Sequence, residues 1–406
     1  MWRTAYLRAL GDERTCPMMT FRILATTACA SLVATTACLE KPGRASVELT
    51  DSAGVRILVY PNDDRLLQWQ FDALWEVGGA NDSRLQLVEL GNHHVVVDLA
   101  DNILLLDEVG SRVFVISKAG EFLRTFGRRG EGPGELKVPS ALAVDRNGTV
   151  SVYDIGKQSL VRWGPTGSLA SEVRIPVSFW GPKIRTTAED TALFAALPNA
   201  LAQSDEQMLM EWTPAGGRAL ARLERLPDRM ADFPTCGFNG IEIPPLFAPE
   251  LVWDAAVGRV ALNVWPEYRI DVLGNGGPLL SIRRDTPMRK VSASDALREV
   301  AEGMPIAVVD CTVPAQEVVR GRGYADVLPA VADLMLAPNG DLWVSRGRFK
   351  GEAATVDIYA NDGSYKGTLP ADSPFPAAFL SSGEFVAIEH DPREVPRLVL
   401  YRVVSS

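Results

Sequence analysis

Six charged or amide residues are the first candidates for chemistry in this sequence. Four of them close short apolar segments of the strand type, and two lie in a glycine-rich loop at residues 127–134. If the fold gathers them at one channel mouth, they would form a ring of mixed charge for a small polar or anionic ligand. The ring would consist of Arg128, Arg129, Asp107, Asp154, Asn263 and Arg346. The competing interpretation is that the two aspartates cap their own turns and that the arginines are solvated.

Known catalytic and phosphate-binding motifs do not explain these residues. The glycine-rich loop lacks the Gly-Lys-Ser ending of a P-loop and does not open a helix. A crossing between two repeats, which needs the positive φ of glycine, is the better interpretation. Gly-x-Ser-x-Gly, His-Glu-x-x-His and EF-hand patterns do not occur in the sequence. We therefore predict no catalytic residue.

The histidines and cysteines give no pattern of metal ligands. His93 and His94 are adjacent, so on a strand they would point to opposite faces, and His390 is isolated. Cys236 and Cys311 each lack a second cysteine nearby, which argues against zinc. In an oxidising compartment these two could instead form a disulfide. The sequence predicts neither a metal nor another cofactor.

A degenerate repeat decides the fold class. Asn147-Gly148 separates two short strands with alternating apolar residues, and 159–163 and 168–173 continue them into a four-stranded meander. The pattern recurs 47 residues earlier and, more weakly, around 254, 340 and 383, while 180–230 must hold one further copy. We predict an all-β fold, a six-bladed β-propeller with four-stranded antiparallel blades.

The two ends of the repeat array predict how the ring closes. The last copy has only three strands, and residues 73–78 resemble the outer strand at 122–127, 49 positions later. The N-terminal strand should therefore complete the last blade. Val55–Tyr60 is expected to add a further strand there. Residues 292–302 are predicted as a helix inserted between the fourth and fifth blades, capped by Ser292 and Asp295 and ended by Gly303.

The N-terminal residues predict export. We expect translation to start at Met18 or Met19, because Arg22 and the uncharged run 23–37 then form a signal peptide. Thr35-Thr36-Ala37 before Cys38 resembles a lipobox, which would place a lipid on Cys38; Cys29 follows the same letters but comes too early. The alternatives are a plain secretory signal and, less well supported by length, a membrane-spanning anchor. The predicted organisation is export signal 1–37, tether 38–53 and a single propeller 54–406.

The inter-blade segment carries a family resemblance. Residues 126–136, followed by Pro139 and Ala143-Val144-Asp145, resemble the signature of NHL-type repeats. The layout is similar to that of bacterial six-bladed, TolB-like propeller lipoproteins, which often begin Asp-Ser-Ala-Gly-Val-Arg, here residues 51–56. The resemblance implies the fold and a membrane-anchored location facing the periplasm or cell exterior, but no reaction.

The charge of the chain and its expected location together limit the classes of partner that we expect. The formal net charge of −10 disfavours nucleic acid and anionic lipid surfaces, so membrane contact is expected through the lipid alone. We predict a monomeric, non-enzymatic binding or scaffold propeller whose partner is an envelope protein or a small polar ligand. The alternative is a lactonase-like hydrolase or a lyase with a divalent ion in the channel, for which Asp107, Asp154 and Asn263 are the candidate ligands.

Overall fold

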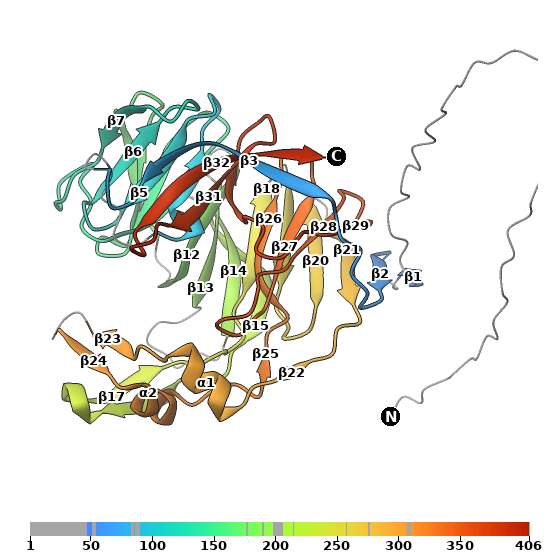
Figure 1. Cartoon of the computed structure of the whole chain (residues 1–406). Helices are drawn as coiled ribbons and strands as arrows, with labels where there is room; N and C mark the ends of the chain where they lie inside the picture. Colours follow the sequence, from blue (N-terminus) through green and yellow to red (C-terminus); the bar gives the residue numbers. More distant parts are fainter. Residues whose placement is uncertain are drawn as a thin grey trace, which may run out of the picture. The chain divides into compact units, whose positions relative to one another are not determined.

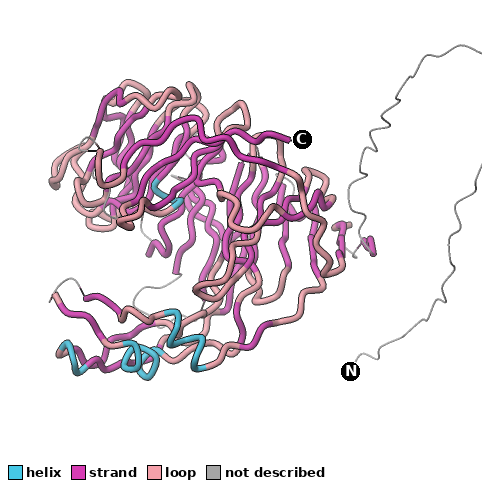
Figure 2. Tube along the Cα trace, viewed as in Figure 1, coloured by secondary structure: helices cyan, strands magenta, loops and turns pink. Residues whose placement is uncertain are grey.

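Six blades, each of four antiparallel strands, form a β-propeller, as the sequence predicts, and two further strands extend the sheet of the fourth blade (Figures 1 and 2). The computed structural model describes residues 47–405, with gaps at 51–53, 83–84, 86–89, 176–177, 189–190, 198–205, 214, 257, 275–276 and 307–309. The first strands of neighbouring blades contact one another, so they line the central channel.

The strands of each blade follow one another along the chain in blades one to five. Blade one comprises β4 (Val95–Val97), β5 (Ile103–Asp107), β6 (Arg112–Ile116) and β7 (Phe122–Phe126). Blade two comprises β8 (Pro139–Val144), β9 (Val150–Asp154), β10 (Ser159–Trp163) and β11 (Leu169–Arg174). Blade three comprises β12 (Ser178–Ala188), β13 (Thr191–Leu197), β14 (Glu206–Thr213) and β15 (Gly216–Glu224). Blade four comprises β18 (Val252–Ala256), β19 (Arg259–Asn263), β20 (Arg269–Gly274) and β21 (Gly277–Arg284). Blade five comprises β26 (Val331–Leu336), β27 (Leu342–Arg346), β28 (Val356–Tyr359) and β29 (Tyr365–Thr368).

Packing between blades forms the core. Both faces of a middle strand are covered by neighbouring blades, so β5 and β9 are buried along almost their whole length. The outer strand β7 is mostly exposed. Between blades one and two, for example, Leu104, Val113 and Trp163 belong to one buried cluster. Burial of this apolar surface is the main term that holds adjacent blades together.

Blade six is built from both ends of the chain, which confirms the predicted closing strand. The C-terminal strands β30 (Pro376–Phe379), β31 (Phe385–His390) and β32 (Pro396–Ser405) are completed by β3 (Trp69–Gly78). The pairing of β3 with β32 is antiparallel, with a bulge between Ala73 and Trp75. The indole of Trp75 also donates to the carbonyl of Lys118 in blade one at 2.8 Å. Blade six is therefore joined to its neighbour across the closure.

The strand predicted at 55–60 lies on a different blade from the one expected. β2 (Arg56–Tyr60) pairs in parallel with β21, and β1 (Val47–Thr50), within the predicted tether, pairs with β2. The assignment to the last blade was therefore wrong. Gly363 of blade five has a φ of +84°, and an added Cβ would lie 2.9 Å from Leu58, so glycine permits this approach.

The chain then crosses blade five before it reaches blade six. Leu66 forms a parallel bridge with Thr368 at the edge of β29. We call residues 56–78 the N-terminal strap, because this segment contacts blades four, five and six in turn. A parallel edge strand is possible here because the strap arrives from outside the blade and not through a hairpin.

Two insertions fold together into a small cap. The first holds β16 (Arg229–Phe233), η2 (Pro234–Cys236) and β17 (Phe238–Ile243), between blades three and four. The second lies between blades four and five and holds β22 (Arg289–Lys290), α1 (Ala293–Glu299), β23 (Met304–Ile306), β24 (Cys311–Val313), α2 (Ala315–Arg322) and β25 (Val327–Leu328). Figure 1 shows most of these elements below the blades. The predicted helix and its Ser292–Asp295 capping box are confirmed as α1, although the helix ends at Glu299.

A disulfide and a separate core hold the cap together. Cys236 of the first insertion and Cys311 of the second are bonded, with their Cα atoms 5.8 Å apart. Ala231, Phe233 and Val318 lie in the buried cluster beneath them. The bond links residues 75 positions apart, and a long closed loop of this kind restricts the unfolded chain strongly.

Substituting Trp75 by alanine tests how far closure stabilises the ring. We expect Trp75→Ala to lower the free energy of unfolding by about 2–3 kcal/mol, because it removes packing against Gly120 and the bond to Lys118. Leu74→Ala is the matched control. That side chain is exposed on the same strand, and its loss should cost less than about 0.5 kcal/mol. Urea denaturation measures both, and equal effects would contradict a role for the Trp75 contact in closure.

Candidate functional site

The predicted acidic residues hold the turns of their own blades. The Asp107 carboxylate accepts the Gly110 N–H at 2.7 Å and the Arg112 Nε–H at 2.9 Å. Asp154 is fully buried and accepts the backbone N–H groups of three residues at 2.5–3.1 Å: Lys137, Val138 and Lys157. Asp154 thus fixes the crossing from blade one to blade two. These contacts occupy the oxygens that a metal or ligand would need.

Three further predicted residues also make local contacts. Arg128 is exposed and pairs with Glu135 at 2.7 Å, while the Arg129 guanidinium donates to the Val109 carbonyl at 3.0 Å. The buried Asn263 amide donates to the carbonyls of Glu267 and Arg269 at 3.1 and 2.7 Å. The channel cavities described below are lined by other residues.

Arg346 belongs to a buried ionic network between blades four and five. Its guanidinium donates to both oxygens of Asp357 at 2.6 and 2.7 Å and to Asp64 of the strap at 2.6 Å. Tyr268 also donates to Asp357 at 2.7 Å. Burial opposes the charged form of Arg346, but the two carboxylates outweigh it and raise the pKa of Arg346 above its usual range. Burial and then Asp357 raise the pKa of Tyr268.

The same network ties the strap to the propeller. Arg284 is fully buried and donates to the Asp63 carbonyl at 2.8 Å and to the Asp64 carboxylate. Arg346 also lines a pocket of about 230 Å³ beside the base of the cap. Because its guanidinium already binds two carboxylates, we assign this residue to strap attachment.

Polar side chains from four blades meet across the central channel and border both of its cavities. The Lys183 ammonium on β12 donates to the Asp333 carboxylate on β26 at 3.1 Å and to the Trp253 carbonyl on β18 at 2.9 Å. Asn92, just before β4, donates to the same aspartate at 3.1 Å. We call these contacts, with the Arg185–Asp254 pair at 2.9 Å, the channel waist.

An irregularity in β12 places the two cations in the channel. The register of β12 against β13 shifts between Phe179 and Ile184, so β12 has extra residues that are not paired with β13. A bulge of this kind redirects the side chains that follow it. Lys183 lies within the shifted segment and Arg185 follows directly after it, and both side chains are mostly buried.

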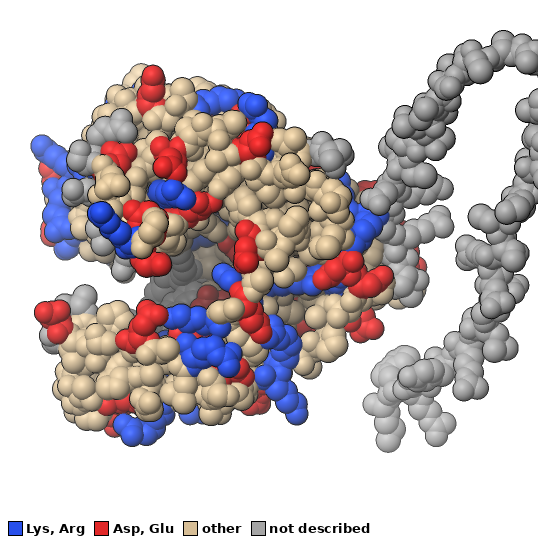
Figure 3. Space-filling view, in the orientation of Figure 1, with Lys and Arg blue, Asp and Glu red and all other residues tan. Residues whose placement is uncertain are grey.

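Above the waist, on the side of the cap, lies a polar cavity of about 280 Å³. Its lining includes Asn92, His93, Lys183, Gln207, Glu250 and Asp333. On the face drawn in Figure 3, a hollow lies between the cap and the blades. We call the cavity of about 280 Å³ the capped mouth. Its walls carry both donors and acceptors, as expected of a site for a small polar molecule.

Glu250 is the most unusual residue of the capped mouth. It is accessible to solvent and makes no hydrogen bond or ion pair with any residue that the structure describes. Burial by the surrounding atoms raises its pKa, and the Arg225 and Arg322 charges offset this only in part. The Glu250 carboxylate is surrounded by protein atoms but reaches solvent, and neither of its oxygens accepts a hydrogen bond from a described residue. It is therefore available to a ligand.

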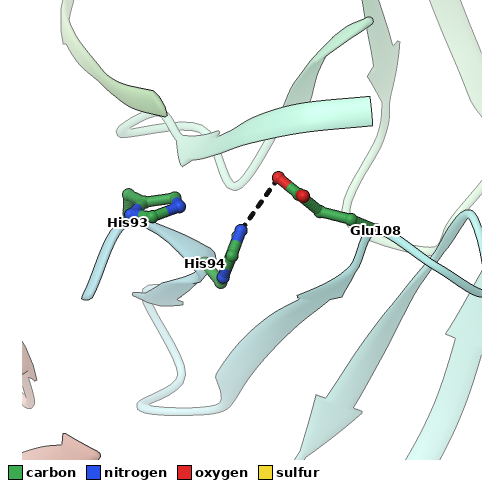
Figure 4. A group of neighbouring side chains, drawn as sticks. All are labelled: His93, His94 and Glu108. Carbon is green, nitrogen blue, oxygen red and sulfur yellow. Dashed lines mark hydrogen bonds and ion pairs between the residues drawn. The ribbon is translucent and has the colours of Figure 1, made fainter. Parts of the chain in front are cut away.

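The adjacent histidines lie together and not on opposite faces. They occupy a 3-10 turn, η1 (Asn92–His94), and their ring centroids are 3.9 Å apart, so the sequence-based expectation about their orientation was wrong. Figure 4 shows them with Glu108, the one group of possible metal ligands among the described residues. The His94 Nε2 lies 2.9 Å from the Glu108 carboxylate.

The tautomer of His94 disfavours a metal there. Its Nδ1 accepts the Gly91 N–H at 2.9 Å, so Nε2 must carry the proton that it donates to Glu108. Coordination through Nε2 would move the proton to Nδ1, where it would oppose the Gly91 N–H. Burial, and then His94 and Lys183, lower the pKa of His93 to about 3, so His93 is neutral at pH 7.

Comparison with known proteins supports the fold. Residues 86–210 match the family model described as "6-bladed beta-propeller". A predicted exported protein of Bacteroides fragilis superimposes with a TM-score of 0.51 at 13% identity, over 86% of this chain and 100% of that one. A member of the DUF4221 family from Bacteroides vulgatus gives 0.51 at 7% identity, over 84% and 100%. The resemblance to bacterial six-bladed propellers is thereby confirmed.

A more distant likeness extends to an enzyme. A gluconolactonase of Xanthomonas campestris gives a TM-score of 0.39 at 12% identity, over 90% of this chain and 99% of that one. A likeness at this level carries no argument about activity. Comparison with curated proteins finds no match.

Sequence reasoning missed the residues of the capped mouth. Lys183 and Gln207 lie in blade three, where the repeat is faint, and Glu250 and Asp333 belong to no motif. A positional signal was available for Asn92, Glu250 and Asp333, which lie just before or early in the first strand of a blade. Lys183, in the middle of β12, and Gln207, in the third strand of blade three, offered no such signal. That signal required the strand boundaries of every blade, which the sequence left open for blade three.

The pH dependence of stability should reveal the cost of the ionised Glu250. A raised folded-state pKa means that its stabilising contribution is full below the unfolded value near pH 4.3 and lost as pH rises through the folded pKa. We therefore expect Glu250→Gln to raise the melting temperature slightly at pH 7, because solvent screens much of the cost at this exposed side chain, and to have almost no effect near pH 4. Glu131→Gln, at an exposed glutamate whose pKa is lowered by Lys137, should show no such gain. Thermal melts at both pH values measure the difference, and a gain that is independent of pH would contradict this account.

Proposed function

We propose that this chain is a non-enzymatic binding propeller of the cell envelope and that it takes a small polar ligand in the capped mouth. The observation that carries the proposal is the unpartnered Glu250 carboxylate in a cavity built from several blades beneath a disulfide-bonded cap. A scaffold would not need an ionised group held there at a cost to stability.

The charges of the capped mouth favour a ligand with both an amino and an acidic group. Glu250 offers an acceptor for an amine, while Arg322 of α2 lies close enough to influence its pKa. The Lys183 and Asp333 charges neutralise each other. A zwitterion, such as an amino acid or a short peptide, matches this distribution better than an anion does.

An enzymatic role is the second candidate, and the capped mouth again supplies its residues. Glu250, with a raised pKa, and His93, held neutral, line the same cavity and could exchange protons with a substrate. The divalent-ion site considered from the sequence is not favoured, because the Asp107 and Asp154 carboxylates hold a turn and a blade crossing and all three residues lie outside the lining of the two channel cavities. Turnover would therefore depend on Glu250.

One observation supports a location outside the cytosol. The Cys236–Cys311 disulfide is of the kind that persists in oxidising compartments. No helix in the described part of the chain is long and apolar enough to cross a membrane. The export signal and Cys38 lie outside the described residues, so the lipid anchor is part of the proposal.

A binding assay with a defined panel tests the proposed ligand class. We expect one or more of the twenty amino acids or a set of dipeptides to raise the melting temperature of the purified protein. Calorimetry on the best solute should then show a roughly 10-fold or greater loss of affinity in Glu250→Gln and none in Glu131→Gln. No shift from any zwitterion, or equal affinities in both variants, would overturn the proposal. Consumption of the solute, followed by NMR, would favour the enzymatic alternative.

Metabolic labelling tests the anchor. Cells that express the full chain and are fed a radiolabelled fatty acid should incorporate label into the protein. We expect Cys38→Ser to abolish the label and Cys29→Ser to retain it, because only Cys38 follows the complete apolar run. Label that survives Cys38→Ser would contradict the predicted site.

A further inference from the structure

The central channel has a second cavity below the waist, and nothing above assigns it a role. All six blades contribute to its lining, and its volume is about 430 Å³, within the usual range for small-molecule sites. Small side chains leave this space, including Ala143, Ala255, Ala256, Ala377 and Ala378. We call this cavity the lower chamber.

The walls of the lower chamber are mainly apolar, and its few charged groups are satisfied, with one exception. Asp98 accepts two backbone N–H groups of its own turn at 2.8 and 2.9 Å. Asp101 accepts the Ser381 N–H at 2.8 Å and pairs with Lys118. Asp254 is bonded to Arg185 and to the Leu336 N–H at 2.8 Å.

The exception is Arg185, which lies at the closed end of the chamber. Its Nε donates to Asp254 at 2.9 Å and its Nη1 donates to the Ile184 carbonyl at 3.0 Å. A guanidinium has five N–H donors, and the other three have no partner among the residues that the structure describes. The side chain is mostly buried, but its unbonded nitrogen is not among the atoms that are sealed from solvent, so these donors are open to a molecule in the chamber.

We propose that the lower chamber binds a compact amphiphilic carboxylate, with its apolar body along the channel wall and its carboxylate on Arg185. Carboxylate and guanidinium match as a bidentate pair, and this pairing is strongest in a site with little water. The aliphatic walls select an alkyl or aromatic body over a sugar or a nucleotide. This site is separate from the capped mouth, because the waist lies between the two cavities.

Isothermal titration calorimetry of the purified protein with octanoate, octylamine and octanol tests the head group. We expect octanoate to bind one-to-one and at least 10-fold more tightly than either of the others. Arg185→Gln should weaken octanoate roughly 10–100-fold and leave octanol unchanged. Arg128→Gln, at an exposed arginine outside the channel, is the matched control and should change nothing.

A second variant tests the chamber without touching the arginine. Ala256 is only partly buried and lines the chamber, so Ala256→Phe should fill the space while the chain still folds. We expect it to reduce octanoate affinity at least 10-fold. Equal binding of octanoate and octylamine, or octanoate binding that survives Ala256→Phe, would overturn the proposal. Glu250→Gln should leave octanoate affinity unchanged, so this result stands or fails separately from the capped mouth.

Discussion

Ring closure by the N-terminal strap is the constraint on which the rest of this structure depends. Neither end of the chain can complete blade six alone, since β30, β31 and β32 present an open edge until β3 pairs with β32. An open edge would leave unpaired backbone groups and an incomplete ring. The lower chamber is lined by residues of all six blades, so it exists only in the closed ring.

The strap is held by charge as well as by strand pairing. Asp64 lies between Arg346 and the fully buried Arg284, and both arginines also approach Asp357. Burying a charged group removes it from water, and this desolvation costs free energy. Such a network therefore adds less stability than apolar packing of the same volume would. The network instead fixes the register of the strap. Asp64 can pair with the two arginines only when it lies at this junction between blades four and five.

The sequence predicted the regular half of the propeller well and the elaborated half poorly. In blades one and two, the turn at Asn147-Gly148 and the capping aspartates Asp98 and Asp145 repeat with fixed spacing, and each does the same structural work. Local chemistry therefore sufficed there. The partner of β2 could not be predicted, because a parallel edge contact depends on where a distant strand ends. The contacts of His93 and Lys183 depended on a 3-10 turn and a bulge, for which no residue pattern is diagnostic.

The places where the repeat fails are the places where the sites lie. The two insertions of the cap lie between blades three and four and between blades four and five, and the irregular strand β12 belongs to blade three. These three blades supply Lys183, Arg185, Asp254 and Asp333. A strand that keeps the regular pattern buries apolar side chains between blades and leaves the channel to small residues. The shift in β12 instead places two cations inside the channel, where each needs a carboxylate from another blade. Apolar residues of similar size would close a channel at lower cost in desolvation, so stability alone does not account for the waist. The waist is better understood as a partition between the two cavities. It leaves a polar cavity on one side and an apolar cavity, with a cation at its inner end, on the other.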